Sequence, residues 1–190
     1  MKKHLGLLVI IFIFSATGHA QNSNVSRLTN VSEYQVKAAF LYNFAKFVDW
    51  PKEVIADSSK PIIIGILGKD PFGLDLDQTI AGETVKGRKL VVKRFHQIAD
   101  LEFCHILYIS PSEKKNLAKI IEKVKNSSVL SVSEVKRFAE EGGIINLFNE
   151  NNKVRFEINV QAAERAGLRI SSRLLRLATI IGDDETNGKK

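Results

Sequence analysis

Apolar residues recur along this chain with two spacings, which predict strands and helices in alternation. Four segments rich in apolar residues are typical of strands, and they occupy 61–68, 88–95, 103–110 and 128–133. After the third segment, a capping box at Ser110–Glu113 precedes apolar residues at helical spacing, which predicts a helix. Alternation of this kind predicts a mostly parallel sheet with helices on both of its faces.

The pattern changes after residue 143, where two apolar runs flank the turn-rich tetrad 149–152. The second run alternates apolar and polar residues, so a β-hairpin is predicted to close the sheet. Short helices are predicted at 70–76 after an Asp70 cap, at 134–143, at 161–167 and from a cap at Ser171 to Ile181. The sequence therefore predicts an α/β fold: a single-domain sandwich whose mixed, mostly parallel sheet has helices on both faces, with a C-terminal β-hairpin plus helix.

The stretch EYQVKAAFLYNFAKFVDWP (33–51) predicts a helix that Ser32 caps and that the Trp50-Pro51 pair ends. Two apolar stripes run along it; the first holds Phe40, Phe44, Phe47 and Val48, and the second holds Tyr34, Ala38, Leu41 and Ala45. A membrane-surface helix would need a broad basic face, which this helix lacks. Packing on the sheet accounts for one stripe. We expect the second stripe, with Trp50, to contact a dimer mate or another partner protein; full burial within the domain is the alternative.

The first 20 residues have the three parts of a secretory signal peptide. Lys2 and Lys3 precede an apolar run at 5–14, and small residues follow at a cleavage site that ends with Ala20. We therefore expect an exported chain that is cleaved after Ala20. Residues 21–31 are interpreted as a linker, 32–182 as the α/β domain and 183–190 as a disordered tail.

Composition narrows the possible functions. The 190 residues carry a formal net charge of +7, but acidic groups are interspersed with basic ones, and export argues against nucleic-acid binding. Cys104 is the only cysteine, so no intramolecular disulfide is expected. It lies in an apolar strand, which favours a buried and unreactive thiol.

Catalytic motifs are scarce in the sequence. Once the signal peptide is removed, His96 and His105 remain, and the apolar surroundings of His105 favour a core histidine over a catalytic base. No metal-binding spacing and no nucleophile elbow occur. The loop GILGKDPFG lacks the spacing and the hydroxyl of a P-loop, so it is interpreted as a strand-to-helix turn. We therefore predict no enzyme, no metal and no cofactor.

One basic cluster could bind a small anion. Six cations and two acids lie between Lys153 and Arg176, and Arg169 stands in the joint before the helix that Ser171 caps. Guanidinium groups pair with carboxylates and phosphates, so Arg169, Ser171 and Arg88 are candidate ligand-binding residues. A solvated basic face is the alternative.

Several segments, taken in order, resemble the YfiR family. They are EYQVKAAFLYNFAKFVDWP, IGILGKDPFG, CHILYIS, VLSVSE, GGIINL and VRFEINVQAAERAGLRISSRLLRLA, which together extend from Glu33 to about Ile181. The resemblance implies a periplasmic regulatory protein that is not an enzyme. The family's type member represses a membrane-bound diguanylate cyclase by binding its periplasmic part, and release of this repression raises cyclic di-GMP and promotes biofilm formation.

The resemblance also implies partners and a ligand site. Family members are reported to form dimers and to bind small molecules, and the family's ligand pocket would fall near Arg169 and Ser171. The partner of this chain would be a membrane-bound sensor, either a diguanylate cyclase or a histidine kinase. A periplasmic protein that binds a small anion for sensing or uptake, without a protein partner, is the alternative function.

Overall fold

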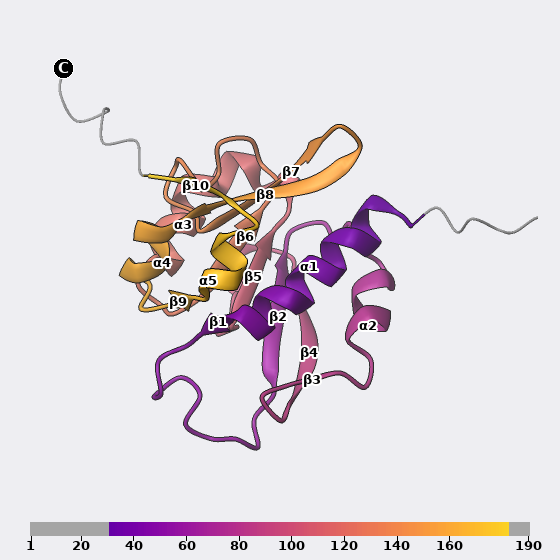
Figure 1. Cartoon of the computed structure of the whole chain (residues 1–190), viewed down its shortest axis with the longest axis vertical. Coiled ribbons are helices and arrows are strands. Elements are labelled where there is room, and N and C mark those ends of the chain that lie inside the picture. The colour runs from indigo at the N-terminus through magenta and orange to yellow at the C-terminus, as the bar shows by residue number, and fades with distance from the viewer. Residues whose placement is uncertain (1–30, 183–190) are drawn as a thin grey trace, which may run out of the picture. The chain divides into compact units, whose positions relative to one another are not determined.

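A mixed eight-stranded sheet organises residues 31–182, which are the part of the chain that the computed structural model describes (Figure 1). From one edge to the other its strands are β10 (Thr179–Ile181), β8 (Lys153–Asn159), β7 (Ile145–Glu150), β6 (Leu130–Ser133), β5 (Ile106–Ile109), β2 (Ile62–Leu67), β4 (Arg88–Phe95) and β3 (Thr84–Val85). A separate antiparallel pair joins β1 (Val48–Asp49) to β9 (Arg169–Ile170). The helices are α1 (Glu33–Phe47), α2 (Asp75–Ile80), α3 (Leu117–Val124), α4 (Val160–Arg165) and α5 (Ser172–Leu175), with 3-10 turns at Ile98–Asp100 and Pro111–Asn116.

The strand directions confirm the predicted mixed sheet. The central strands β4, β2, β5, β6 and β7 are parallel, whereas β8 runs antiparallel to β7 and β3 antiparallel to β4. The chain leaves β2 toward β4 on one side, and it leaves β5 toward β6 on the other. The sheet therefore has its topological switch point between β2 and β5.

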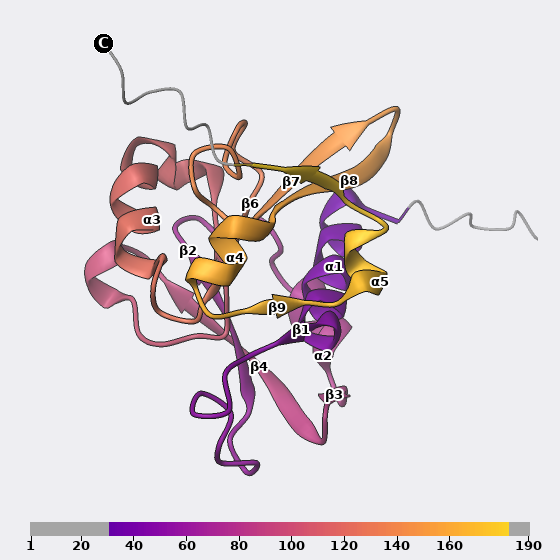
Figure 2. The ribbon, with the colours of Figure 1, turned by 60° about the vertical axis from the view of Figure 1, so that its left-hand side comes forward.

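Apolar side chains fill both faces of the sheet. On one face, β5 and β6 contribute Ile106, Tyr108 and Val132 to a large cluster that also contains residues of α1, α2, α4 and α5. On the other face, Leu107 and Ile109 pack with residues of α3 in a second cluster. Figure 2 shows α1 and α3 on opposite sides of the strands. The α/β sandwich with helices on both faces is confirmed.

Helix α1 begins as predicted, at a capping box. The Ser32 hydroxyl accepts a hydrogen bond from the Gln35 backbone N–H, and the Gln35 side chain accepts one from the Ser32 N–H. The helix ends at Phe47, and the next two residues form β1 instead of a further helical turn.

Both apolar stripes of α1 are covered within the domain. Phe40 and Phe44 meet the ring of Phe156 on β8, with ring centroids 5.3 and 5.4 Å apart. The other side lies beside α2 and the residues around it, where the Tyr34 ring stands edge-on to Phe72 and the Tyr42 hydroxyl donates to Glu83. As a result Ala38, Leu41 and Ala45 are fully buried. These three residues belong to the core, which corrects their assignment as a surface for a second chain.

Three predicted helices differ in the structure. Asp70 does not cap a helix, because its carboxylate accepts hydrogen bonds from the Phe72 N–H and from Arg94, and α2 begins only at Asp75. Residues 134–143 form turns, with a positive φ at Arg137. The last helix ends at Leu175, because 179–181 pair with β8 as strand β10 and satisfy their backbone groups in the sheet.

One further prediction is confirmed only in part, and others concern residues outside the described part of the chain. Ser110 does cap, but its hydroxyl accepts from the Ser112 N–H and opens a 3-10 turn before α3. The predicted signal peptide at 1–20, the linker up to residue 30 and the tail at 183–190 lie outside the described residues. Among residues 31–182, no helix has the length and apolar character needed to cross a membrane.

We expect Leu41→Ala to lower the free energy of unfolding by about 2–5 kcal/mol, because a fully buried leucine is replaced by a cavity. The matched control is Leu177→Ala, whose side chain is 70% exposed and whose loss should change stability by less than about 0.5 kcal/mol. Urea unfolding of both variants measures the difference. Equal stability of the two variants would contradict the burial of the second stripe.

Candidate functional site

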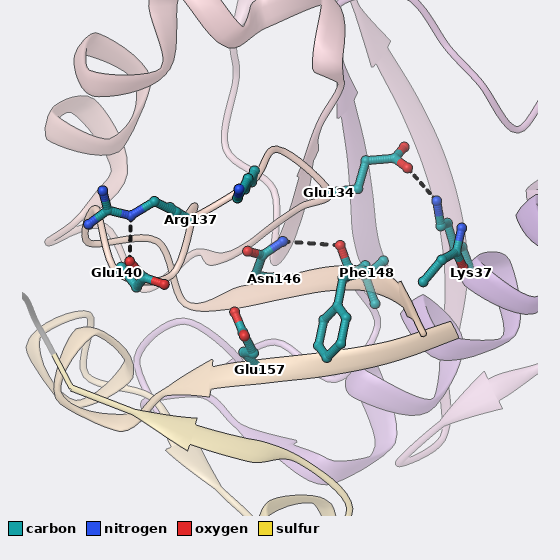
Figure 3. A pocket seen from close by; sticks show the side chains of 10 residues that line it. Lys37, Glu134, Arg137, Glu140, Asn146, Phe148 and Glu157 are labelled. Atoms are coloured by element: carbon teal, nitrogen blue, oxygen red, sulfur yellow. Dashed lines mark hydrogen bonds and ion pairs between the residues drawn. The ribbon is translucent and has the colours of Figure 1, made fainter. Parts of the chain in front are cut away.

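A pocket of about 430 Å³ lies at the carboxyl end of β6 (Figure 3). Glu134 follows β6 directly, and strand β7 extends beyond β6 because only its first two residues pair with it. The pocket is bounded by α1, by the turns of 134–143 and by the β7–β8 hairpin. Its polar lining residues are Lys37, Glu134, Lys136, Arg137, Glu140, Asn146, Asn149 and Glu157.

The topological switch point itself is filled. Gly68 follows β2 with a φ of +89°, and a Cβ built on it would lie 2.4 Å from the Ser112 hydroxyl oxygen. The same hydroxyl accepts a hydrogen bond of 2.9 Å from the Lys69 backbone N–H. The loops after β2 and β5 thus close on each other, which agrees with the interpretation of GILGKDPFG as a plain turn. The open space on this edge of the sheet lies two strands away, beside β6 and β7.

A buried lysine forms one side of the pocket. Lys37 is only 1% exposed, and its ammonium group donates to the carboxylates of Glu33 and Glu134. A charge of this kind is costly to bury without partners, so two carboxylates explain how a lysine fits within α1's apolar surface. Glu33 keeps a lowered pKa, chiefly because it accepts a hydrogen bond from Lys37.

Two tyrosine hydroxyls also donate hydrogen bonds to Glu134. The Tyr34 hydroxyl donates to the Glu134 carboxylate at 3.0 Å, and the Tyr108 hydroxyl donates to the same oxygen. Burial, reinforced by the charge of Glu134, raises the pKa of Tyr34 to about 12 and also raises the pKa of Tyr108. Both phenols therefore remain protonated donors. The Lys37 ammonium also lies 4.6 Å from the centre of the Tyr34 ring.

The other side of the pocket carries a second set of polar groups. The Arg137 guanidinium donates to Glu140 at 2.5 Å. Asn146 is 3% exposed, and its amide nitrogen donates to the backbone oxygens of Ser133 and Leu147. The pKa of Glu157 is raised, first by partial burial and then by the nearby charge of Glu140. Figure 3 shows Asn146, Phe148 and Glu157 between the Lys37–Glu134 pair and the Arg137–Glu140 pair.

This arrangement favours binding over bond-breaking chemistry. Lys37 and Glu134 are held by each other and by two tyrosines, so neither is poised to transfer a proton to a substrate. Within the described residues, no group of three or more His, Cys, Asp or Glu side chains is placed to hold a metal ion. The site is a polar pocket whose most deeply buried charges are paired with each other.

The anion-site candidates Arg169, Ser171 and Arg88 do not line this pocket. Arg169 is exposed on β9, opposite Asp49 of β1. The Ser171 hydroxyl accepts from the Leu174 N–H as the cap of α5, and its backbone N–H donates to Phe47. The hydroxyl and the backbone N–H of Ser171 therefore both form hydrogen bonds within the domain.

Arg88 has a structural position that corrects its assignment as a ligand residue. It is 8% exposed, and its guanidinium donates to the backbone oxygens of Ile55, Asp57 and Lys60. These bonds attach the segment before β2 to the start of β4. Trp50, the remaining partner-contact candidate, is also buried, and its indole N–H has no hydrogen-bond partner among the described residues.

The core assignments of His105 and Cys104 are confirmed. His105 is buried, its Nδ1 accepts from the Ile63 N–H at 3.0 Å, and burial lowers its pKa to about 4. Cys104 is buried next to Gly65, and burial raises the pKa of its thiol to about 12. Neither side chain is available for catalysis at neutral pH.

Sequence reasoning missed the pocket residues. Lys37 carried a usable signal, because a lysine placed between two apolar stripes of a helix must find a buried counter-charge. Glu134 and Asn146 carried no such signal in the sequence. They lie close together because β7 extends beyond β6, and this depends on how the two strands pair.

The fold and the site define a mixed α/β protein with a polar pocket at the carboxyl edge of its sheet. The chain belongs to the YfiR/HmsC-like family, whose model matches residues 34–179. This family is periplasmic and regulatory in character, and membership points to regulation of cyclic di-GMP signalling. The resemblance to the YfiR family that the sequence motifs carry is thereby confirmed.

A solved structure supports the fold. A conserved domain protein from Vibrio cholerae O1 biovar El Tor superposes with a TM-score of 0.51 at 16% sequence identity. The match covers 78% of this chain and 60% of that protein, so the chain corresponds to less than two thirds of its length. Among proteins of curated function, none matches the sequence.

We expect Glu134→Leu to destabilise the protein by about 3 kcal/mol, because Lys37 then stays buried with a single counter-charge. The double variant Lys37→Met, Glu134→Leu should be more stable than Glu134→Leu alone, since the unpaired charge is also removed. Urea unfolding of Glu134→Leu, of Lys37→Met and of the double variant measures this coupling. As a control, Glu122→Gln in an exposed ion pair should have little effect. Strictly additive losses would show that the buried pair is not coupled.

Stability should fall as the pH drops from about 6.5 to about 4, because the unfolded imidazole of His105 takes up a proton that the folded one refuses. The loss attributable to His105 should reach about 3 kcal/mol near pH 4 and level off just below that pH. His105→Gln should flatten this part of the profile, whereas His96→Gln, which removes an exposed imidazole, should not. Chemical unfolding at a series of pH values measures the slopes, and identical slopes for wild type and His105→Gln would refute the assignment.

Proposed function

We propose that this chain is an exported, non-enzymatic signalling regulator that binds the periplasmic part of a membrane sensor and restrains its output. The observation that carries the proposal is the family match over residues 34–179. The sensor would be a diguanylate cyclase or a histidine kinase, and its restraint would lower cyclic di-GMP and limit biofilm formation. The signal-peptide pattern at 1–20 supports export to the compartment where such a sensor part lies.

The regulation would operate by population shift. A regulator that binds one state of its partner more tightly holds the partner in that state, and an envelope signal that changes this preference changes the output. The pocket at the end of β6 is a suitable place for such a signal to bind. It borders both α1 and the β7–β8 hairpin, so its occupant would contact two separate elements of the surface.

The pocket also supports a binding role for this chain more than a catalytic one. Its most deeply placed charged groups, Lys37 and Glu134, are engaged with each other, and Glu134 also accepts from Tyr34 and Tyr108. The alternative of a small-anion binder has less support, because Arg88 is used to hold a loop and Ser171 to cap α5.

Deletion of the gene should raise cyclic di-GMP or the output of a membrane kinase and increase biofilm formation, and a plasmid copy should restore the parental level. Direct measurement of cyclic di-GMP and of kinase-dependent transcription checks the outcome. Unchanged levels of both in the deletion strain would contradict the proposed regulation.

Photocrosslinking in intact cells tests the partner. The crosslinking residue is placed at Leu74 or Leu177, whose side chains are large, apolar and exposed near opposite ends of the strand order. The matched control places it at Lys119, an exposed polar position on α3. Capture of one membrane sensor from Leu74 or Leu177, and not from Lys119, is the expected result. Capture only of a second copy would support a homodimer and count against a sensor partner at these positions.

A further inference from the structure

The Asn146 side chain offers the pocket at the end of β6 a hydrogen-bond acceptor that the fold leaves unused. Asn146 is 3% exposed, and its amide nitrogen donates to the Ser133 oxygen at 3.3 Å and to the Leu147 oxygen at 3.0 Å. These two carbonyls fix the amide orientation, because the side-chain oxygen could not replace the nitrogen as their donor. The oxygen therefore faces the pocket, and within residues 31–182 it accepts no hydrogen bond.

A carboxylate stands next to this oxygen. Asn146 and Glu157 are direct partners across the β7–β8 ladder, so their side chains lie on the same face with Cβ atoms about 5 Å apart. Both side chains line the pocket, and Figure 3 shows them beside each other. Among the described residues, the Glu157 carboxylate has no ion-pair partner, and Glu140 nearby repels it.

Two of the three cations on the pocket wall are committed to other groups. Lys37 is held between Glu33 and Glu134, and Arg137 donates to Glu140. The exposed Lys136 has a flexible side chain that solvent can hydrate. The Asn146 oxygen and the Glu157 carboxylate are thus two acceptors that lack a donor, and together they favour a positively charged occupant.

An aromatic ring lies next to these acceptors. Phe148 is two residues beyond Asn146 on β7, so it is on the same face of the strand, and it is only half-buried at the pocket wall. A carboxylate, an amide oxygen and the face of an aromatic ring are the groups that recognise an organic ammonium ion. An inorganic cation would have no alkyl part to pack on the ring.

We propose that this pocket binds the ammonium group of a small primary amine, which donates to the Asn146 side-chain oxygen and to Glu157 and rests its alkyl part on Phe148. This inference goes beyond the proposed regulatory function, because it assigns a ligand class to the site where an envelope signal would enter. The site is separate from the Arg169 and Ser171 candidates, and the ligand has the opposite charge to the one they would take.

The test is a titration of the purified protein with n-butylammonium, monitored by calorimetry and by the NMR signal of the Asn146 side-chain amide. We expect saturable binding and a shift of that signal. n-Butanol, which lacks the charge, should not bind, and tetramethylammonium, which donates no hydrogen bond, should bind at least about tenfold more weakly. Absence of saturable binding up to about 50 mM butylammonium would overturn the proposal.

Variants locate the binding site. Glu157→Gln keeps the shape of a partly exposed side chain and should weaken butylammonium binding by about tenfold. Phe148→Leu should weaken it by a smaller factor. Glu141→Gln removes an exposed carboxylate of the neighbouring turn that does not line the pocket, and it should leave the affinity unchanged.

Two results would exclude the proposed contacts. Equal affinity of wild type and Glu157→Gln would show that the amine binds elsewhere, and displacement of butylammonium by an equal concentration of K⁺ or Ca²⁺ would show a site for inorganic cations. The titration requires no protein partner, so failure to bind an amine leaves the regulatory proposal standing. Conversely, unchanged cyclic di-GMP and kinase output in the deletion strain would leave amine binding intact.

Discussion

Burial of the Lys37 ammonium is the constraint on which the site depends. An ammonium group that is removed from water must keep its hydrogen bonds and a counter-charge, and here Glu33 and Glu134 provide both. Glu134 in turn receives the hydroxyls of Tyr34 and Tyr108. A single buried charge on α1 thereby fixes the residue that follows β6, and with it the start of the turns that form one wall of the pocket.

The two ends of the parallel strands have different roles. Near the start of β4, Arg88 donates to three backbone carbonyls and holds the segment before β2, so that end is closed by backbone contacts. At the carboxyl end, the loops after β2 and β5 pack on each other, and the overhang of β7 beyond β6 leaves space for a pocket. Ligands of α/β sheets bind outside the carboxyl ends of the strands, and the pocket of this protein lies at that edge but away from the switch point.

Local patterns predicted most of the fold, because each of the correct elements follows from nearby residues. The Ser32 cap, the central apolar strand and the Asn-rich turn of the β7–β8 hairpin can all be identified within short windows. The errors arose where distant partners decide the local structure. Asp70 accepts a hydrogen bond from Arg94 on β4, and residues 179–181 pair with β8. The second stripe of α1 is covered by α2 and its neighbours. The candidate site could not be predicted for the same reason, since Asn146 and Glu157 meet only through the strand register.

The buried Lys37–Glu134 pair is better explained by how it positions neighbouring elements than by a contribution to stability. Replacing a buried ion pair with well-packed apolar residues is often neutral or stabilising, so the cost of desolvating Lys37 and Glu134 brings no clear gain to the fold. An apolar pair at these positions would keep α1 on the sheet, but it would remove the acceptor to which Tyr34 and Tyr108 donate. It would also remove the charged side of the pocket opposite Asn146 and Glu157. The network therefore makes most sense as the means by which α1 and the end of β6 are held beside one polar space, which the proposed response to a bound ligand would require.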